Sequence, residues 1–191
     1  MHNLAIIPAR GGSKRIPHKN IKDFFGKPII SYPILEALSS QIFSEVMVST
    51  DSIKIAKLSE KIGAKIPFIR SQENSDDHAI LPDVIEEVLG EYKKLGKDFD
   101  NICCIMPTNP FLTSDILTDS FKKFKEGDGE SMIAVKKLNT PIEKTYELKN
   151  NILYPAFKDH FKTRTQDLKP KYSDAGSFFW VTVGAFNSYK K

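Results

Sequence analysis

Cysteine is scarce in this chain of 191 residues, and its two cysteines, Cys103 and Cys104, are adjacent. A disulfide bond between neighbouring residues is badly strained, so a disulfide-stabilised scaffold is excluded. Both cysteines lie in an apolar run, which predicts two buried, reduced thiols and a reducing compartment. The sequence therefore predicts a cytoplasmic protein.

Long apolar runs are missing as well. No stretch approaches the roughly 20 apolar residues that a membrane-spanning helix needs. Residues 1–7 show no charged region followed by a long apolar one. We therefore predict neither a signal peptide nor association with a membrane.

The excess of one charge is small. The chain has 28 basic and 24 acidic residues, which gives a formal net charge of +4. This excess suits a small anionic substrate but is too weak to indicate nucleic acid, so we predict no nucleic-acid partner. A hydrophobic content of 40% and a charged content of 27% are those of a folded globular protein and argue against disorder.

Segments typical of strands and helices alternate along most of the chain. Short apolar runs fit buried strands, and apolar residues at helical spacing follow them. The predicted strands are residues 4–8, 45–50, 65–69, 101–106 and 132–135, and the predicted helices are residues 31–38, 53–62, 81–95 and 113–125. This order predicts an open, mostly parallel, Rossmann-like α/β sheet with helices on both faces.

The pattern changes after residue 136. Residues 140–171 mix short β-like pieces with three prolines and many polar side chains, which predicts an excursion from the main sheet. Residues 177–183 predict a strand that returns to the sheet, with Trp180 packed in the core. We predict a single domain over residues 1–191, with residues 140–171 as a small subdomain.

The loop after the first strand, residues 8–20, is the first candidate for function, because open α/β sheets bind ligands beyond the carboxyl ends of their strands. Gly11 and Gly12 let backbone amides approach a ligand closely. Four cations, at positions 10, 14, 15 and 19, surround the glycines. Amides ringed by cations suit a triphosphate, and a solvated basic turn is the alternative. The glycine spacing fits neither a P-loop nor the dinucleotide fingerprint.

Residues 10–20, Arg-Gly-Gly-Ser-Lys-Arg-Ile-Pro-His-Lys-Asn, resemble the signature of the cytidylyltransferases that activate sialic acid and related nine-carbon sugars. The resemblance spans essentially the whole chain. Further similar motifs are residues 25–29, 48–51, 70, 75–76 and 107–110. Residues 164–168 and 172–180 resemble the pseudaminic acid branch of this family in particular.

The resemblance implies a CTP site in which cations hold the phosphates and Asn20 approaches the cytosine. The implied nucleotide-binding residues are Arg10, Gly11, Gly12, Ser13, Lys14, Lys19, Asn20 and Arg70, and the implied catalytic residues among them are Arg10 and Lys19. Arg70 is equally consistent with a surface arginine at a strand end. Asp51 could orient the nucleotide, but its position before a predicted helix favours an N-cap.

For the sugar, the resemblance implies a second group of residues. These are Thr108, Asn109, Arg164, Gln166 and Asp174. An arginine fork such as that of Arg164 pairs well with a sugar carboxylate. Met106 and Leu112 stand where related sialic acid enzymes have glutamine and arginine, which weakens an assignment to sialic acid.

The resemblance also implies Mg²⁺, which would bridge the phosphates and offset their charge. Family members hold the ion with two aspartates in an Ile-Asp-x-x-x-Asp motif after the returning strand, and this sequence lacks that motif. No metal ligand is therefore assigned. We expect the C-terminal end of the family fold to be missing from this chain, which would leave CTP binding intact but catalysis poor.

The predicted reaction is attack of the anomeric hydroxyl of pseudaminic acid on the α-phosphate of CTP, which releases pyrophosphate and yields CMP-pseudaminic acid for surface or flagellar glycans. The resemblance further implies a homodimer that pairs through residues 140–171. Three alternatives stay open. They are CMP activation of another acidic sugar (sialic, legionaminic or 3-deoxy-octulosonic acid), a glycosyltransferase on the same fold, and a non-catalytic module that binds phosphate or nucleic acid.

Overall fold

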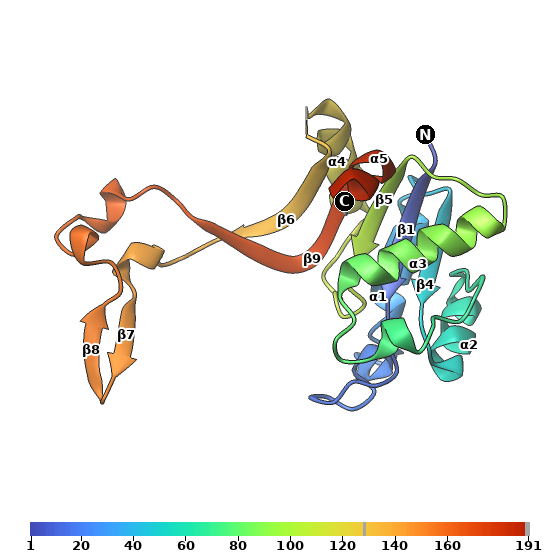
Figure 1. Ribbon diagram of the computed structural model, residues 1–191, viewed down its shortest axis with the longest axis horizontal. Helices are drawn as coiled ribbons and strands as arrows, with labels where there is room; N and C mark the ends of the chain where they lie inside the picture. The colour runs from blue at the N-terminus through green and yellow to red at the C-terminus, as the bar shows by residue number, and fades with distance from the viewer. Residues whose placement is uncertain (128, 190–191) are drawn as a thin grey trace. The chain divides into compact units, whose positions relative to one another are not determined.

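Strand β1, Asn3–Pro8, lies inside a five-stranded sheet with the order β4-β1-β5-β9-β6 (Figure 1). It pairs in parallel with β4, Glu45–Ser49, and with β5, Asn101–Ile105. The computed structural model describes residues 1–127 and 129–189. Because β1 has a neighbouring strand on each side and helices above and below, the strand is buried from Asn3 to Ile7.

The other two strands complete the sheet. β9, Tyr172–Thr182, pairs antiparallel with β5, and β6, Ser131–Lys137, follows it in the sheet order. The sheet is thus mixed but mostly parallel, and the predicted fold class is confirmed. β9 begins five residues earlier than the predicted strand at residues 177–183.

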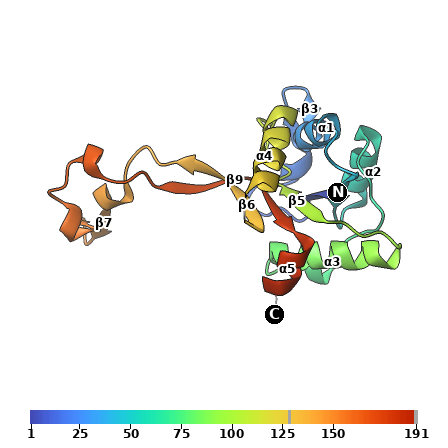
Figure 2. The same ribbon diagram turned by 90° about the horizontal axis from the view of Figure 1, so that it is seen from above.

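Within the part of the chain that the structure describes, five α-helices cover the two faces of the sheet. They are α1, Ser31–Ser39; α2, Ile53–Ile62; α3, Leu81–Lys94; α4, Ser114–Glu126; and α5, Val183–Tyr189. Figure 2 shows α3 and α5 on one side of the sheet and α1 and α4 on the other. The predicted helices are confirmed to within one residue at each end.

The core has two layers because successive strand side chains point to opposite faces. The layer under α3 and α5 joins strand residues to helix residues, including Leu4, Ile6, Met47, Cys104, Val88 and Tyr92. Cys103 and Cys104 are both buried and free, as predicted. Burial raises the pKa of Cys104 to about 12, so its thiol stays protonated at neutral pH.

The layer on the α4 side centres on Trp180, which is fully buried as predicted. Its ring stacks on Phe43 with 5.4 Å between the ring centroids and also lies against Phe124. The indole Nε1–H donates to Ser120 Oγ at 2.9 Å, so this buried donor is satisfied.

The strand predicted at residues 65–69 is wrong. Only Lys65 forms a bridge, to Met47 of β4, through hydrogen bonds to Val46 and Val48. The next donor that a parallel ladder would use belongs to residue 67, which is a proline and has no N–H. Pro67 therefore ends the pairing after one bridge.

The chain divides into two compact units. The first, Met1–Ile133 and Ser177–Lys191, contains the elements above except for the last part of β6 and the first part of β9. The second unit is Ala134–Gly176. It holds a hairpin of β7, Tyr146–Lys149, and β8, Ile152–Pro155, and three short 3-10 helices, Ile142–Lys144, Lys158–His160 and Thr165–Asp167. Asn150 and Asn151 make the turn with φ of 50° and 63°, the left-handed conformation that asparagine tolerates and two-residue hairpins need.

The predicted excursion, residues 140–171, lies within this second unit. Its role in pairing or in sugar binding stays a prediction. Among the residues that the structure describes, no helix is long and apolar enough to cross a membrane.

We predict that Ser120→Ala destabilises the protein by about 1–3 kcal/mol, because it leaves the buried indole N–H of Trp180 without an acceptor. Urea denaturation followed by circular dichroism measures the free energy of unfolding. In a Trp180→Phe background the indole donor is absent, so Ser120→Ala should lower the free energy of unfolding clearly less than it does in the wild type. An equal cost in both backgrounds would contradict the assigned role of this hydrogen bond.

Candidate functional site

The glycine loop leaves β1 at the edge where the carboxyl ends of the parallel strands meet. Ala9 N still donates to Ser49 O of β4 at 2.8 Å, and Gly11 N then donates to Asp51 Oδ1 at 2.7 Å. A Cβ on Gly11 would lie 3.0 Å from the Cβ of Ser52, so the close approach favours glycine here. The loop is thus fixed to the end of the neighbouring strand.

Asp51 has a different role from the one that the sequence favoured. The N-cap of α2 is Ser52, whose Oγ accepts from Ile55 N at 3.4 Å. Asp51 instead accepts the amide of Gly11. The N-cap prediction for Asp51 is therefore wrong, because the helix begins one residue later than that role requires.

Asn20 ties the end of the loop to its beginning. Its side chain is 3% exposed, and Nδ2 donates to the carbonyl oxygen of Arg10 at 2.9 Å. The backbone carbonyl oxygen of Asn20 accepts from Ile30 N at the start of α1. Asn20 Oδ1 is buried without a hydrogen-bond partner among the described residues. The predicted approach of Asn20 to cytosine stays a prediction.

The remaining loop residues are more open to solvent. Ser13 N donates to Gly11 O at 3.0 Å, which curls the chain after the glycines. Gly12, Lys14, Arg15 and Lys19 are exposed, and Arg10 is half-buried. The structure thus gathers the predicted nucleotide-binding residues of the first loop at one edge of the sheet.

A carboxylate that the sequence analysis missed forms ion pairs with two of these cations. Arg10 Nη2 lies 3.0 Å from Asp77 Oδ1, and Lys14 Nζ pairs with Asp77 Oδ2. The hydrogen bond from Lys14, assisted by the charge of Arg10, holds the pKa of the Asp77 carboxyl below its usual value. The sequence feature that could have identified this carboxylate is the acidic pair Asp76-Asp77, which follows the strand predicted at residues 65–69 and is opposite in charge to the basic loop.

Arg70 is 6% exposed, so the surface-arginine alternative is wrong. Its Nε donates to Ser49 Oγ at 2.9 Å, and its Nη2 donates to the carbonyl oxygen of Ser49. Burial lowers the pKa of this guanidinium, and Asp51 opposes the shift. Arg70 therefore supports the end of β4, and its predicted contact with the nucleotide stays a prediction.

The predicted sugar contacts of the first unit lie where β5 ends. Asn109 Nδ2 donates to Ser177 Oγ at 2.6 Å, and Met106 N donates to Ser177 O at 2.8 Å. Thr108 is half-buried beside Asn109. These contacts join the end of β5 to β9.

The other predicted sugar contacts belong to the second unit. Arg164 forms a two-pronged pair with Asp167, with Nε to Oδ2 at 2.8 Å and Nη2 to Oδ1 at 3.1 Å. Gln166 is exposed. Asp174 Oδ1 accepts from Gly176 N at 2.7 Å. The roles of all three residues in sugar binding stay predictions.

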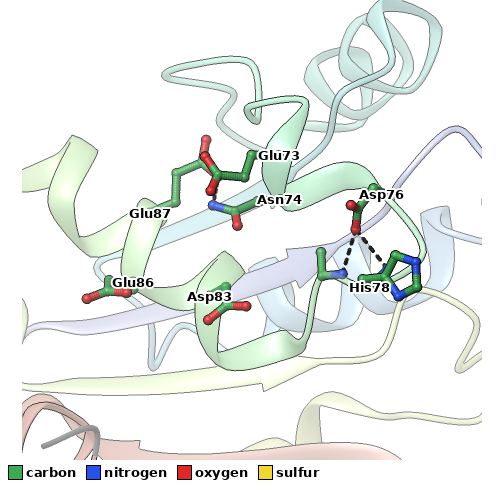
Figure 3. Close-up of a pocket in the computed structure, with 8 residues that line it drawn as sticks. Glu73, Asn74, Asp76, His78, Asp83, Glu86 and Glu87 are labelled. Atoms are coloured by element: carbon green, nitrogen blue, oxygen red, sulfur yellow. Dashed lines mark hydrogen bonds between the residues drawn. The ribbon is translucent and has the colours of Figure 1, made fainter.

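An acidic cavity of about 530 Å³ opens beside Asp76 (Figure 3). Its lining consists of Glu73, Asn74, Asp76, His78, Ala79, Asp83, Glu86 and Glu87. Five carboxylates there repel a triphosphate, so the cavity is not the phosphate site. Within residues 1–127 and 129–189, no three His, Cys, Asp or Glu side chains converge as metal ligands. Because Mg²⁺ is usually held by one or two carboxylates together with substrate phosphates, no described residue is assigned as a ligand of the Mg²⁺ that the resemblance implies.

Comparison with known proteins gives consistent results. A family model described as Cytidylyltransferase matches residues 4–176. The chain is 43% identical to a pseudaminic acid cytidylyltransferase of Campylobacter jejuni subsp. jejuni serotype O:2 over 187 residues, 97% of this chain and 81% of that protein. It is 29% identical to a CMP-N,N'-diacetyllegionaminic acid synthase of Legionella pneumophila subsp. pneumophila, over 96% of this chain and 79% of that protein.

The fold also matches that of a solved structure. CMP:2-keto-3-deoxy-manno-octonic acid synthetase complexed with CTP superposes with a TM-score of 0.74, at 18% identity, over 100% of this chain and 78% of that one. At this identity, the likeness supports the fold of the chain.

We predict that Asp51→Ala frees the glycine loop. Loss of a charged acceptor for the Gly11 amide is worth about 1.5–3 kcal/mol, so amide exchange over residues 10–13 should become about 10- to 100-fold faster. Hydrogen–deuterium exchange with mass spectrometry measures this rate. Asp51→Asn keeps an acceptor oxygen and serves as the control. Unchanged exchange in Asp51→Ala would show that other contacts hold the loop.

Proposed function

The chain belongs to the cytidylyltransferase family, and from that membership we propose that it transfers CMP from CTP to the anomeric hydroxyl of pseudaminic acid. The identity of 43% to the Campylobacter enzyme, against 29% to the legionaminic acid synthase, supports pseudaminic acid over legionaminic acid as the acceptor. The product then serves surface or flagellar glycans. The proposed setting is the cytoplasm, with no nucleic-acid partner.

The observation that carries the proposal is the loop from Arg10 to Asn20, which Asp51 fixes at the carboxyl edge of β1. The amides after Gly11 and the cations Arg10, Lys14 and Lys19 belong to one loop at this edge, and a bound triphosphate needs such donors and charges. Arg10 and Lys14 bind the phosphates, and Lys19 with Arg10 stabilises the charge that develops as pyrophosphate leaves. Gly12 supplies a backbone donor, Ser13 supplies its hydroxyl because its amide already donates to Gly11, and Asn20 approaches the base.

Arg70 receives a positioning role in this proposal. Its guanidinium is occupied by Ser49, and Ser49 ends the strand that leads directly into Asp51. Arg70 therefore acts on the nucleotide through the strand end that holds the loop. Mg²⁺ would supply charge compensation to the phosphoryl transfer, but no step is assigned to it, since the described residues do not identify its ligands.

On the acceptor side, the sugar carboxylate and hydroxyl groups need an arginine fork and neutral hydrogen-bonding groups. Thr108 and Asn109 at the end of β5 supply the neutral groups. For the second unit, taken by itself, the proposed sugar-binding residues are Arg164, Gln166 and Asp174. Asp167 holds the fork of Arg164, so the sugar carboxylate has to replace that partner.

The hairpin of the second unit supports a homodimer. Leu148 and Leu153 lie directly opposite each other on β7 and β8 and are 66% and 62% exposed. Paired apolar side chains on one face of a hairpin are more readily explained by a partner than by solvent. We propose that a second copy of the chain covers them.

We predict that, with Mg²⁺ present, the chain releases pyrophosphate from CTP faster when pseudaminic acid is the acceptor than when sialic acid is. A coupled pyrophosphate assay measures the release. Lys19→Ala should lower the rate about 100-fold, because it removes a charge that stabilises the transition state. Arg15→Ala, which removes an exposed cation of the same loop outside the proposed site, is the matched control. Faster release with sialic acid would reject the proposed acceptor.

We predict that Leu148→Lys with Leu153→Lys converts the dimer to a monomer, because two charges would then be buried at the interface. Size-exclusion chromatography with light scattering gives the molecular mass. Glu147→Lys introduces the same side chain on the opposite face of the hairpin and should leave the dimer intact. A wild-type monomer at high concentration would rule out the proposed pairing.

A further inference from the structure

The segment of residues 71–80, between Arg70 and α3, lies against the glycine loop. Glu87 of α3 holds its first half, since its carboxylate accepts from Ser71 N and from Asn74 Nδ2, both at 2.6 Å. Asp76 Oδ1 fixes the second half by accepting the amides of His78 and Ala79 at 2.8 and 2.7 Å, as Figure 3 shows. The segment is thus held at both ends of a tight turn.

This turn presents Asp77 to the cations of the loop. The carboxylate pairs with Arg10 through one oxygen and with Lys14 through the other. The carbonyl oxygen of Asp76 accepts a further hydrogen bond from Arg10 Nη1. Two of the cations assigned to the triphosphate therefore already hold an anion that the protein itself supplies.

We propose that Asp77 is an internal substitute for a phosphate group, which CTP must displace in order to bind. The inference rests on the proposed function, because it takes the loop as the triphosphate site. Arg10 and Lys14 cannot pair fully with both anions, and a carboxylate left beside a phosphate repels it. Asp77 thus sets the affinity that an anion needs in order to replace it at Arg10 and Lys14.

Displacement has a consequence for selectivity. Competition by Asp77 lowers the affinity of every anion that needs both cations. A triphosphate has enough further contacts along the loop to overcome it, whereas CMP or pyrophosphate has fewer. When pyrophosphate departs, Asp77 pairs with the two cations again, which favours release of the product.

The test is Asp77→Asn, with binding of CTP and of inorganic tripolyphosphate measured by isothermal titration calorimetry in EDTA. Exposed ion pairs are individually weak, so loss of two competing pairs should tighten the binding of both ligands about three- to tenfold. The affinity of the variant should also fall more steeply with added salt than that of the wild type. In the wild type, salt weakens the competing pairs of Asp77 and so offsets part of the loss, and the variant lacks these pairs. Asp77 is exposed, so the variant should fold, and its thermal unfolding checks this.

The matched control is Glu73→Gln, which removes one negative charge from the same segment on the side of the acidic cavity. It should leave both affinities within about twofold of the wild type, which separates the specific pairing from general electrostatics. An equal gain in both variants would overturn the proposal.

The outcomes also separate this inference from the proposed function. If the wild type binds CTP and Asp77→Asn binds it equally or more weakly, the inference fails and the proposed function stands. Weaker binding only when Mg²⁺ is added would make Asp77 a metal ligand and would likewise overturn it. If neither protein binds CTP but Asp77→Asn binds tripolyphosphate more tightly, the competition between Asp77 and a polyphosphate stands, whereas CTP as its ligand and the proposed function fail.

Discussion

The hydrogen bond from the amide of Gly11 to the carboxylate of Asp51 is the contact on which the candidate site depends. Parallel pairing brings Pro8 of β1 level with Ser49 of β4, so the two chain segments that follow leave the sheet side by side. The carboxylate then fixes the loop at its first glycine, and Asn20 closes it at the other end. A loop held at both ends keeps its cations at the sheet edge without burying them, and it loses less conformational entropy when a ligand binds.

Carboxylates recur around the cations of this chain. Asp77 pairs with Arg10 and Lys14 in the first unit, and Asp167 pairs with the fork of Arg164 in the second. Each of these cations was assigned to an anionic group of a substrate. Since exposed ion pairs are weak, such partners keep the side chains oriented at a cost that a substrate with several further contacts overcomes. Both halves of the proposed reaction would then begin with the exchange of one anion for another.

Much of the fold was predictable because it follows from local patterns. The alternation of apolar runs and helical spacing located α1 to α4 to within a residue, and the glycines and cations marked the loop. The strand predicted at residues 65–69 was wrong because Pro67 lacks the backbone donor that a ladder needs. The contacts of Asp51 and Asp77 were not predictable, because they join residues 40 or more positions apart in the chain. Only the folded sheet brings these partners together.

The two adjacent thiols lie in a strand, so Cys103 and Cys104 direct their sulfur atoms to opposite sides of the sheet. Cys104 belongs to the layer under α3, whereas Cys103 lies opposite Trp180 in the pairing with β9. Neither is accessible to a reagent in solution, and burial raises the pKa of both. Each side of the protein therefore contains its own chemical reporter. The order in which the two sulfurs become open to alkylation reveals which helical layer detaches first when the molecule loosens.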